Sequence, residues 1–269
     1  MPNWNQILQE IQEFDRRASQ KLDLVRRGYL AELQKKTGRN AIAYYSGFLS
    51  KPGVAQSEIN DEDKNGFMMA VHMLDRAKGL DLILHTPGGS IAATQSIVDY
   101  LHQLFQHPDG GPDVRVIVPQ IAMSAGTMIA CASRQILMTK HANLGPIDPH
   151  LRGVPAYGVI KEFQRACAEV KKEPSSAAVW QAIIGQYRPT FLSQCDNAIK
   201  WSNAFVETHL TETMFRGEPG AKKRAKSIVK RLTDYTGNKT HERHIHFQDC
   251  DDMGLKVKLI EDDPELQDL

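Results

Sequence analysis

The sequence is poor in the features that mark disulfide-linked, zinc-binding and membrane-spanning proteins. It has four cysteines among 269 residues, and no two of them form a Cys-x-x-Cys pair. This spacing fits neither a disulfide framework nor a zinc site, so we expect reduced thiols. No apolar run approaches the roughly 18–20 residues of a transmembrane helix, and residues 1–15 lack the apolar core of a signal peptide. We therefore expect a cytoplasmic protein without an integral membrane segment.

Nucleotide-binding motifs and an excess of charge of one sign are missing as well. The chain has no Gly-x-x-x-x-Gly-Lys loop and no Gly-x-Gly-x-x-Gly fingerprint, and its histidines show no metal-ligand spacing. The formal net charge is +1, although residues 222–231 are basic and residues 249–269 are acidic. Apolar residues interleave the basic run as on the solvated face of a helix. We therefore expect no metal, no cofactor and no nucleic-acid partner.

Hydrophobic periodicity predicts an α/β domain between a long helix and an acidic tail. Apolar residues spaced by three and four predict an amphipathic helix over residues 4–36. Strands and helices then alternate, which predicts right-handed βαβ units around a mainly parallel sheet. We expect strands over 41–49, 80–85, 114–119, 135–139 and 256–260, and helices over 61–78, 90–105, 124–133, 156–172, 176–186, 190–215, 219–233 and 248–253. The predicted division is 1–38 for the N-terminal helix, 39–260 for the domain and 261–269 for the tail, whose last residues should fray.

Three turns that follow predicted strands contain the residues of chemical interest, and open α/β sheets place their sites at such strand ends. The first turn is His-Thr-Pro-Gly-Gly-Ser over residues 85–90. Its paired glycines let a ligand approach the backbone closely and direct N–H groups toward it. Paired glycines of this kind can bind a phosphate or an oxyanion. A tight turn that binds no ligand is the commoner explanation for them.

The second turn places Ser124 at the start of a predicted helix, within Ala-Met-Ser-Ala-Gly-Thr. A serine there is either an N-cap or a nucleophile. In the second case the backbone N–H of the next residue contributes to an oxyanion hole. The small residues Ala125 and Gly126 favour the nucleophile, because they leave room for an acyl group. The third turn, Leu-Gly-Pro-Ile-Asp-Pro-His, contains two prolines that fix the directions of Asp148 and His150.

In order and spacing, the three motifs resemble those of the serine dehydrogenase proteinase family, a distant relative of Clp proteases and signal-peptide peptidase A. The likeness runs from about residue 40 to 258. It implies the Clp-protease/crotonase-like α/β fold, in which repeated βαβ units form a sheet with flanking helices. It also implies a serine hydrolase, a peptidase acting on peptide or protein substrates. Relatives in this fold commonly assemble into rings, so we expect a homo-oligomer, with the long first helix as a candidate interface.

The resemblance also implies a Ser-Asp-His triad in that chain order. Ser124 falls on the nucleophile motif, and Asp148 falls on the family's Gly-Pro-x-Asp-Pro acid. The family's histidine corresponds to His241, with His244 as the second choice and His150 as a further alternative base. Histidine would accept the serine proton while the aspartate orients its ring.

The oxyanion of the tetrahedral intermediate would be bound by backbone N–H groups of the first two turns, namely Gly88, Gly89 and Ala125.

Three alternatives to a Ser-Asp-His peptidase stay open. A Ser–Lys dyad, as in signal-peptide peptidase A, would need a desolvated lysine, and Lys161 and Lys140 are the candidates. A crotonase-type acyl-CoA enzyme would use the same backbone donors on a thioester, without needing Ser124. A catalytically inactive scaffold of the same fold would use the long first helix to bind its partner.

Overall fold

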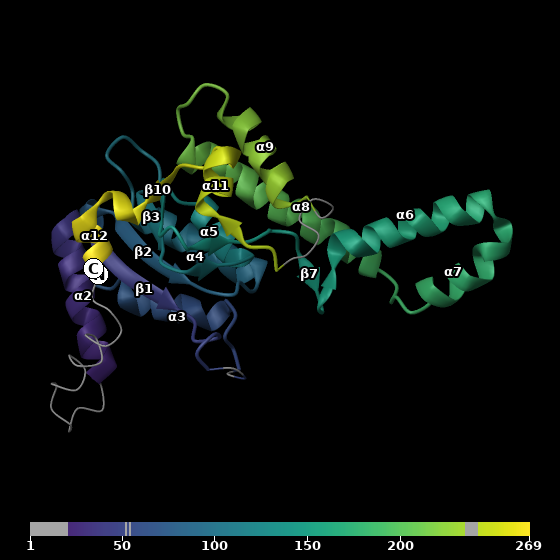
Figure 1. Ribbon diagram of the computed structural model, residues 1–269, viewed down its shortest axis with the longest axis horizontal. Coiled ribbons are helices and arrows are strands. Elements are labelled where there is room, and N and C mark those ends of the chain that lie inside the picture. Colours follow the sequence, from purple (N-terminus) through teal and green to yellow (C-terminus); the bar gives the residue numbers. More distant parts are fainter. Residues whose placement is uncertain (1–20, 52, 54, 235–241) are drawn as a thin grey trace.

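A sheet of five strands forms the centre of the molecule (Figure 1). The computed structural model describes residues 21–51, 53, 55–234 and 242–269. The strand order is β1-β2-β3-β5-β10, and every pairing in it is parallel. The parallel sheet that the sequence predicts is therefore confirmed. Its strands are β1 Asn40–Tyr45, β2 Leu80–His85, β3 Val114–Val118, β5 Ile136–Met138 and β10 Val257–Leu259.

The strand side chains alternate between two cores, one on each face of the sheet. Leu82, Val116 and Ile136 lie in the main core. Their neighbours Ile117 and Leu137 belong to a smaller cluster on the opposite face. Because both faces are covered, apolar side chains lie on both sides of the sheet, as is typical of parallel sheets.

Helices cover both faces. The main core is covered by α3 Asp61–Ala70, α4 Ile91–Leu104, α5 Ala125–Cys131, α8 Phe191–His209, α9 Ala221–Leu232 and α11 Phe247–Met253. The smaller cluster is covered by α2 Lys21–Thr37 and α12 Pro264–Asp268. The predicted helix over 4–36 is found from residue 21 onward, and its earlier part lies outside the described residues.

The sequence missed the shortest elements. β4 Ile121–Ala122, β6 Asn143–Leu144 and β9 Ile245–His246 form a second sheet, and β7 His150–Leu151 pairs with β8 Val154–Pro155 in a hairpin. Two-residue strands are too short to show a period. The helix predicted over 61–78 is also wrong in its second half. It ends at Ala70, and after Met73, at a φ of 65°, the chain forms only a 3-10 turn over Arg76–Lys78.

The C-terminal residues pack against the N-terminal helix instead of fraying. Lys36 forms ion pairs with Asp263, at 3.2 Å, and with Glu265. Leu266 and Leu269 pack against the cluster that contains Leu33 of α2. Helix α2 and the acidic tail therefore cover the same face of the sheet together. The division of the chain into three parts at residues 38 and 260 stays a prediction.

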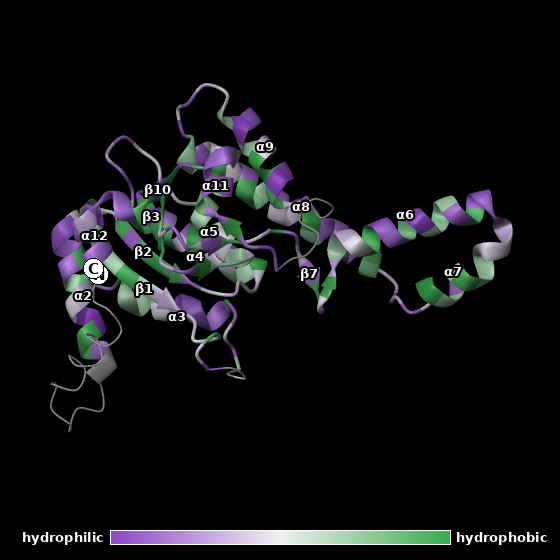
Figure 2. Cartoon of the chain, in the orientation of Figure 1, coloured by the Kyte–Doolittle hydropathy of each residue, from purple (hydrophilic) through white to green (hydrophobic). Residues whose placement is uncertain are grey.

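A helical arm extends away from the sheet (Figure 1). It consists of α6 Ala156–Lys172 and α7 Ala177–Ile184, joined by the 3-10 turn Pro174–Ser176. The Trp180 indole N–H donates to a Glu169 carboxylate oxygen at 2.9 Å and so ties the two helices together. Figure 2 shows α7 as largely hydrophobic, and Val179 on it is 63% exposed. The arm thus presents apolar side chains to solvent.

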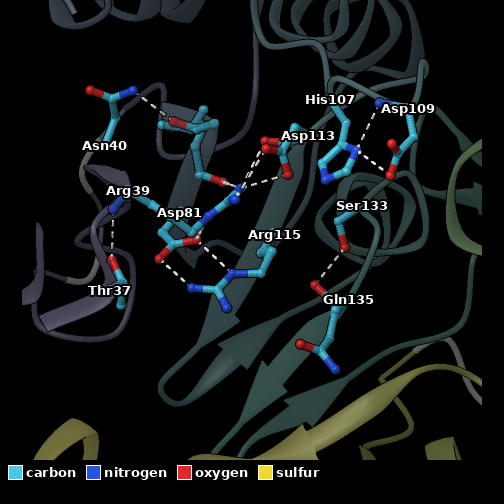
Figure 3. Close-up of polar contacts among 12 residues, drawn as sticks. Thr37, Arg39, Asn40, Asp81, His107, Asp109, Asp113, Arg115, Ser133 and Gln135 are labelled. Carbon is cyan, nitrogen blue, oxygen red and sulfur yellow. Dashed lines mark hydrogen bonds and ion pairs between the residues drawn. The ribbon is translucent and has the colours of Figure 1, made fainter. Parts of the chain in front are cut away.

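An ion-pair network holds the amino ends of the first three strands together (Figure 3). Asp81 in β2 is fully buried and accepts hydrogen bonds from Arg39 Nε at 2.8 Å and from both Nε and a terminal nitrogen of Arg115, at 2.8 and 2.6 Å. Arg39 also pairs with Asp113 at 3.0 Å. These charge-assisted bonds compensate the desolvated carboxylate. The network lies at the opposite ends of the strands from the turns that carry the candidate site.

Two histidine rings meet between α4 and α8. The rings of His102 and His209 are edge to face, with centroids 5.1 Å apart. Burial, and next the charge of His209, lower the pKa of His102 to about 3. Burial also lowers the pKa of His209, against the opposing charges of Asp99 and Glu212. Both imidazoles are therefore neutral in the native protein at neutral pH.

This pair predicts a loss of stability in mild acid. The unfolded chain binds a proton at His102 below about pH 6.5, whereas the native state does not until about pH 3. Stability is thus greatest above about pH 6.5. Between about pH 6.5 and pH 3, proton binding at His102 in the unfolded chain lowers the free energy of unfolding by about 1.4 kcal/mol per pH unit. We expect urea unfolding at pH 7.5 and at pH 5 to show that the free energy of unfolding of His102→Gln changes less with pH than that of the wild type. The exposed His72→Gln variant is the control, and equal slopes in all three proteins would contradict the prediction.

Candidate active site

The first two turns are joined by backbone hydrogen bonds beyond the carboxyl ends of β2 and β3. The Thr86 N–H donates to the Ile121 carbonyl at 3.1 Å, and the Met123 N–H donates to the Thr86 carbonyl at 3.0 Å. The Pro-Gly-Gly turn and the serine turn therefore lie side by side, as expected for parallel strands that end at one edge.

The third turn is attached through Thr127 in α5. The Thr127 hydroxyl donates to the Ala122 carbonyl at 2.9 Å and accepts the Gly145 N–H at 2.9 Å. A β-carbon at Gly145 would lie 2.5 Å from the terminal methyl of Met123, so this flexible side chain would have to move to admit one. The fold thus brings together all three motifs that the sequence singled out.

Ser124 has a strained backbone. It precedes α5 with φ 50° and ψ −114°, in the half of the map that favours glycine. Its hydroxyl accepts no N–H of the helix, so the N-cap interpretation of this serine is wrong. The side chain is half-buried. A strained serine whose hydroxyl does not stabilise its own helix is typical of a functional group.

Gly88 lies directly against the serine. A β-carbon at Gly88 would be 2.7 Å from Cβ of Ser124 and 3.1 Å from the nitrogen of Ala125, and the φ of Gly88 is 107°. Glycine is therefore required at this position both by its backbone conformation and by the close approach. The contact sets the Pro-Gly-Gly turn next to the first N–H of α5.

The N–H groups around the serine differ in their partners. The Gly88 N–H donates to Oγ1 of Thr86 at 3.1 Å. Among the described residues, the N–H groups of Gly89 and Ala125 have no acceptor. The sequence placed Gly88, Gly89 and Ala125 together as oxyanion donors, and the hydrogen bonds favour the last two.

An open cleft of about 640 Å³ lies beside Gly89. Ser90 and His150 also line it, but Ser124 does not. Its other lining residues are polar or acidic except for Ile59, and they come from the segment before α3 and its first turn: Gln56, Glu58, Ile59, Asn60, Asp61 and Glu62. A cleft of this size is large enough for several side chains of a bound peptide or for a small molecule.

Asp148 and His150 form a pair at this cleft. Asp148 is 3% exposed, and one of its carboxylate oxygens lies 3.5 Å from Nε2 of His150. The His150 side chain is 31% exposed. His150 therefore brings an accessible imidazole to the cleft that Gly89 also lines. The buried carboxylate of Asp148 lies beside this imidazole.

The other candidate bases lie in different surroundings. His241 is outside the described residues. His244 is exposed and precedes β9, which pairs with β6 so that Ile245 faces Leu144. This pairing brings the segment that follows His241 to the third turn. Lys161 is an exposed residue of α6, whereas a lysine base requires burial to lower its pKa.

Sequence reasoning missed two residues that shape the site, Thr86 and Thr127. Both are fully buried, and both hydroxyls bond to backbone groups of neighbouring turns. A threonine gives no sign of such a role until its backbone partners are known. His85, which belongs to the first motif, is buried with one ring nitrogen 3.0 Å from the Ser46 carbonyl and the other 3.2 Å from the Gln120 side chain. It therefore supports the fold of the turn.

Residues 14–265 match the model of the ClpP-like SDH-type serine proteinases. The chain belongs to this family. Membership confirms the resemblance drawn from the three motifs and, together with the parallel sheet, the Clp-like α/β fold. The family supports a serine peptidase in general.

Two curated relatives of this ClpP-like chain come from Methanocaldococcus jannaschii. The uncharacterized protein MJ0137 is 32% identical over 199 residues, which are 74% of this chain and 60% of that protein. The uncharacterized protein MJ1495 is 29% identical over 199 residues, covering 74% of this chain and 59% of its own length. The matched region thus spans about 60% of either relative.

Two features are absent from the part of the chain that the structure describes. None of its helices combines the length and the apolar character that crossing a bilayer requires. Nor do its His, Cys, Asp and Glu side chains gather in threes in a way that would hold a metal ion.

Proposed function

We propose that this chain hydrolyses peptide bonds through an acyl-enzyme formed on Ser124. The observation that carries the proposal is the position of this serine. Its backbone is held at a φ of 50°, its hydroxyl caps no helix, and it lies against Gly88. The N–H groups of the neighbouring Gly89 and Ala125 have no acceptor among the described residues. This is the arrangement that acyl transfer requires: a nucleophile with two backbone donors beside it.

The proposed reaction has two steps. A histidine accepts the Ser124 hydroxyl proton while Oγ attacks the peptide carbonyl, and the Gly89 and Ala125 N–H groups bind the resulting oxyanion. The C–N bond then breaks, the histidine returns its proton to the leaving amine, and the acyl group stays on Ser124. In the second step the histidine takes a proton from a water molecule, which attacks the ester carbonyl. The bond between the carbonyl carbon and Oγ then breaks, the histidine returns the proton to Ser124, and the acid product leaves.

We propose Asp148 as the acid of the triad. Its burial beside an imidazole supports this role, because a buried carboxylate fixes the ring tautomer and stabilises the protonated ring. His241 is the base that the family motif implies, and His150 is the alternative that lies 3.5 Å from Asp148. Exposed His244 has less support.

A serine-reactive fluorophosphonate probe tests the nucleophile. We expect the purified protein to be labelled at Ser124 and to hydrolyse unstructured peptides. Ser124→Ala should lose both properties, whereas the exposed Ser50→Ala variant should keep both. A folded protein that takes no label would contradict the proposal, and it would favour a crotonase-like acyl-CoA enzyme or an inactive scaffold.

The same label identifies the base. If His241 is the base, His241→Gln should lower the labelling rate about 10³-fold or more, with little effect in His150→Gln. The reverse pattern would assign the base to His150. Normal labelling in both histidine variants, with loss in Lys161→Met, would contradict the triad and indicate a Ser–Lys dyad.

The surroundings of the site bear on its partners. The cleft beside Gly89 supports a peptide or protein segment as the substrate. The exposed apolar residues of the arm, Val179 and Ile183, support the prediction of a homo-oligomer, because such side chains are often covered at interfaces between subunits. A cytoplasmic location stays a prediction.

A further inference from the structure

The Pro-Gly-Gly turn is connected to the start of α3 by a series of side-chain contacts. Oγ1 of Thr86 accepts the Gly88 N–H at 3.1 Å, and both residues of this bond are buried. The Tyr44 hydroxyl in β1 donates to a carboxylate oxygen of Asp63 at 3.0 Å. The Thr86 side chain also acts on the Tyr44 hydroxyl, whose pKa it lowers. The series therefore runs from the Pro-Gly-Gly turn to the first turn of α3.

Tyr44 keeps its proton in this series. Burial, and next the charge of Asp63, raise the pKa of the Tyr44 hydroxyl, and a hydrogen bond from Thr86 opposes them only in part. The phenol is thus a donor toward Asp63. The same Asp63 oxygen accepts the Asn60 N–H at 2.9 Å, in the capping box of α3. The far end of the series is therefore fixed to the backbone.

Thr86 is also fixed by its own surroundings. Its N–H and carbonyl bond to Ile121 and Met123 on the serine turn. Its methyl group packs so closely on Gly126 that a β-carbon there would be 2.5 Å away. The direction of the Thr86 hydroxyl is therefore determined by contacts on three sides.

We propose that Thr86 is a positioning residue for the peptidase reaction, supported by Tyr44. The inference rests on the function proposed above. By accepting the Gly88 N–H, the Thr86 hydroxyl orients the peptide units of the turn so that the Gly89 N–H is the donor left for the substrate oxyanion. Without this acceptor, a buried N–H is unsatisfied and the turn must rearrange to pair it. Oxyanion donors stabilise the transition state only when they are held in place beforehand.

The test compares isosteric and conservative variants. Thr86→Val keeps the shape and removes the acceptor, and we expect kcat for peptide hydrolysis to fall about 10- to 100-fold with KM within about twofold, less than the loss of an oxyanion donor itself. Thr86→Ser retains the hydroxyl and should recover most of kcat. Tyr44→Phe should show a smaller loss and provides a second variant if Thr86→Val folds poorly. Thr94→Val is the matched control, since Thr94 is a buried threonine whose hydroxyl has no hydrogen-bond partner among the described residues.

A second measurement separates this inference from the proposed function. Amide exchange followed by NMR should show a faster-exchanging Gly88 N–H in Thr86→Val than in the wild type and in Thr86→Ser. A wild type that takes no fluorophosphonate label overturns the proposed function itself. A labelled wild type whose Thr86→Val variant has the same kcat and the same Gly88 exchange overturns only the role of Thr86.

Discussion

Replacing Ser124 with glycine is expected to abolish peptidase activity and to make the protein more stable. The hydroxyl is the proposed nucleophile, and removing a nucleophile from a catalytic triad lowers kcat by about 10⁴- to 10⁶-fold. The φ of 50° costs a residue with a side chain about 1–3 kcal/mol, a strain that glycine does not have. The greater entropy of glycine in the unfolded chain offsets about 0.5–1 kcal/mol of this gain. We expect a net increase of about 1 kcal/mol in the free energy of unfolding.

Ser124→Ala is the matched variant for this experiment. It removes the same hydroxyl but keeps the β-carbon and hence the strain, so its stability should stay close to that of the wild type. Neither variant loses a helix cap, because the Ser124 hydroxyl accepts no N–H of α5. Urea unfolding and peptide hydrolysis of the three proteins measure both effects. A glycine variant no more stable than the alanine variant would show that the backbone at Ser124 is not strained.

Strain at this serine has a structural origin in its neighbours. Gly126 has no room for a β-carbon beside the Thr86 methyl, and a β-carbon at Gly88 would collide with Cβ of Ser124. The hydrogen bonds of Thr86 and Thr127 hold the turns on both sides. The surrounding structure thus determines the unfavourable backbone angles, which is the pattern expected where a fold maintains a functional group against its local preference.

The fold was largely predictable because its long elements have strong periods. The strand over 80–85 and the helix over 156–172 are found with the bounds that the sequence predicts. The strand is buried at nearly every position, and the helix has a clear apolar stripe. The helix predicted over 61–78 was wrong because the apolar residues continue past Ala70, while the chain itself turns at Met73 with a positive φ. Side-chain pattern alone does not report such a break.

The site was predictable in its motifs and not in its hydrogen bonds. Glycine pairs and a serine between small residues indicate close backbone approach, and the structure places these turns in contact. Which N–H groups keep a partner depends on the direction of the Thr86 hydroxyl, and this direction results from tertiary contacts. The choice between His241 and His150 likewise depends on distances to Asp148, and sequence separation does not determine those distances. The contact of His150 with Asp148 is a property of the folded chain.

The largest effect on stability is expected far from the site, at Asp81. This carboxylate is fully buried between the guanidinium groups of Arg39 and Arg115 (Figure 3). Asp81→Ala would leave the Arg115 charge without its ion-pair partner, while Arg39 would retain Asp113. Removing one member of a buried ion pair typically costs about 3–5 kcal/mol, because the remaining charge stays desolvated. We expect a loss of that size in the free energy of unfolding.

Urea unfolding of two further variants tests this explanation. Asp81→Leu/Arg115→Leu removes both charges, so it should be less destabilised than Asp81→Ala although it changes more atoms. Asp109→Asn alters the exposed carboxylate that lies 3.2 Å from Nδ1 of His107, and it should change stability by less than about 0.5 kcal/mol. Because Asp81 lies at the amino ends of the strands and the serine at the carboxyl ends, kcat should be unchanged wherever the variants are folded. A double variant that is as unstable as Asp81→Ala or less stable would show that packing, and not the uncompensated charge, determines the cost at this position.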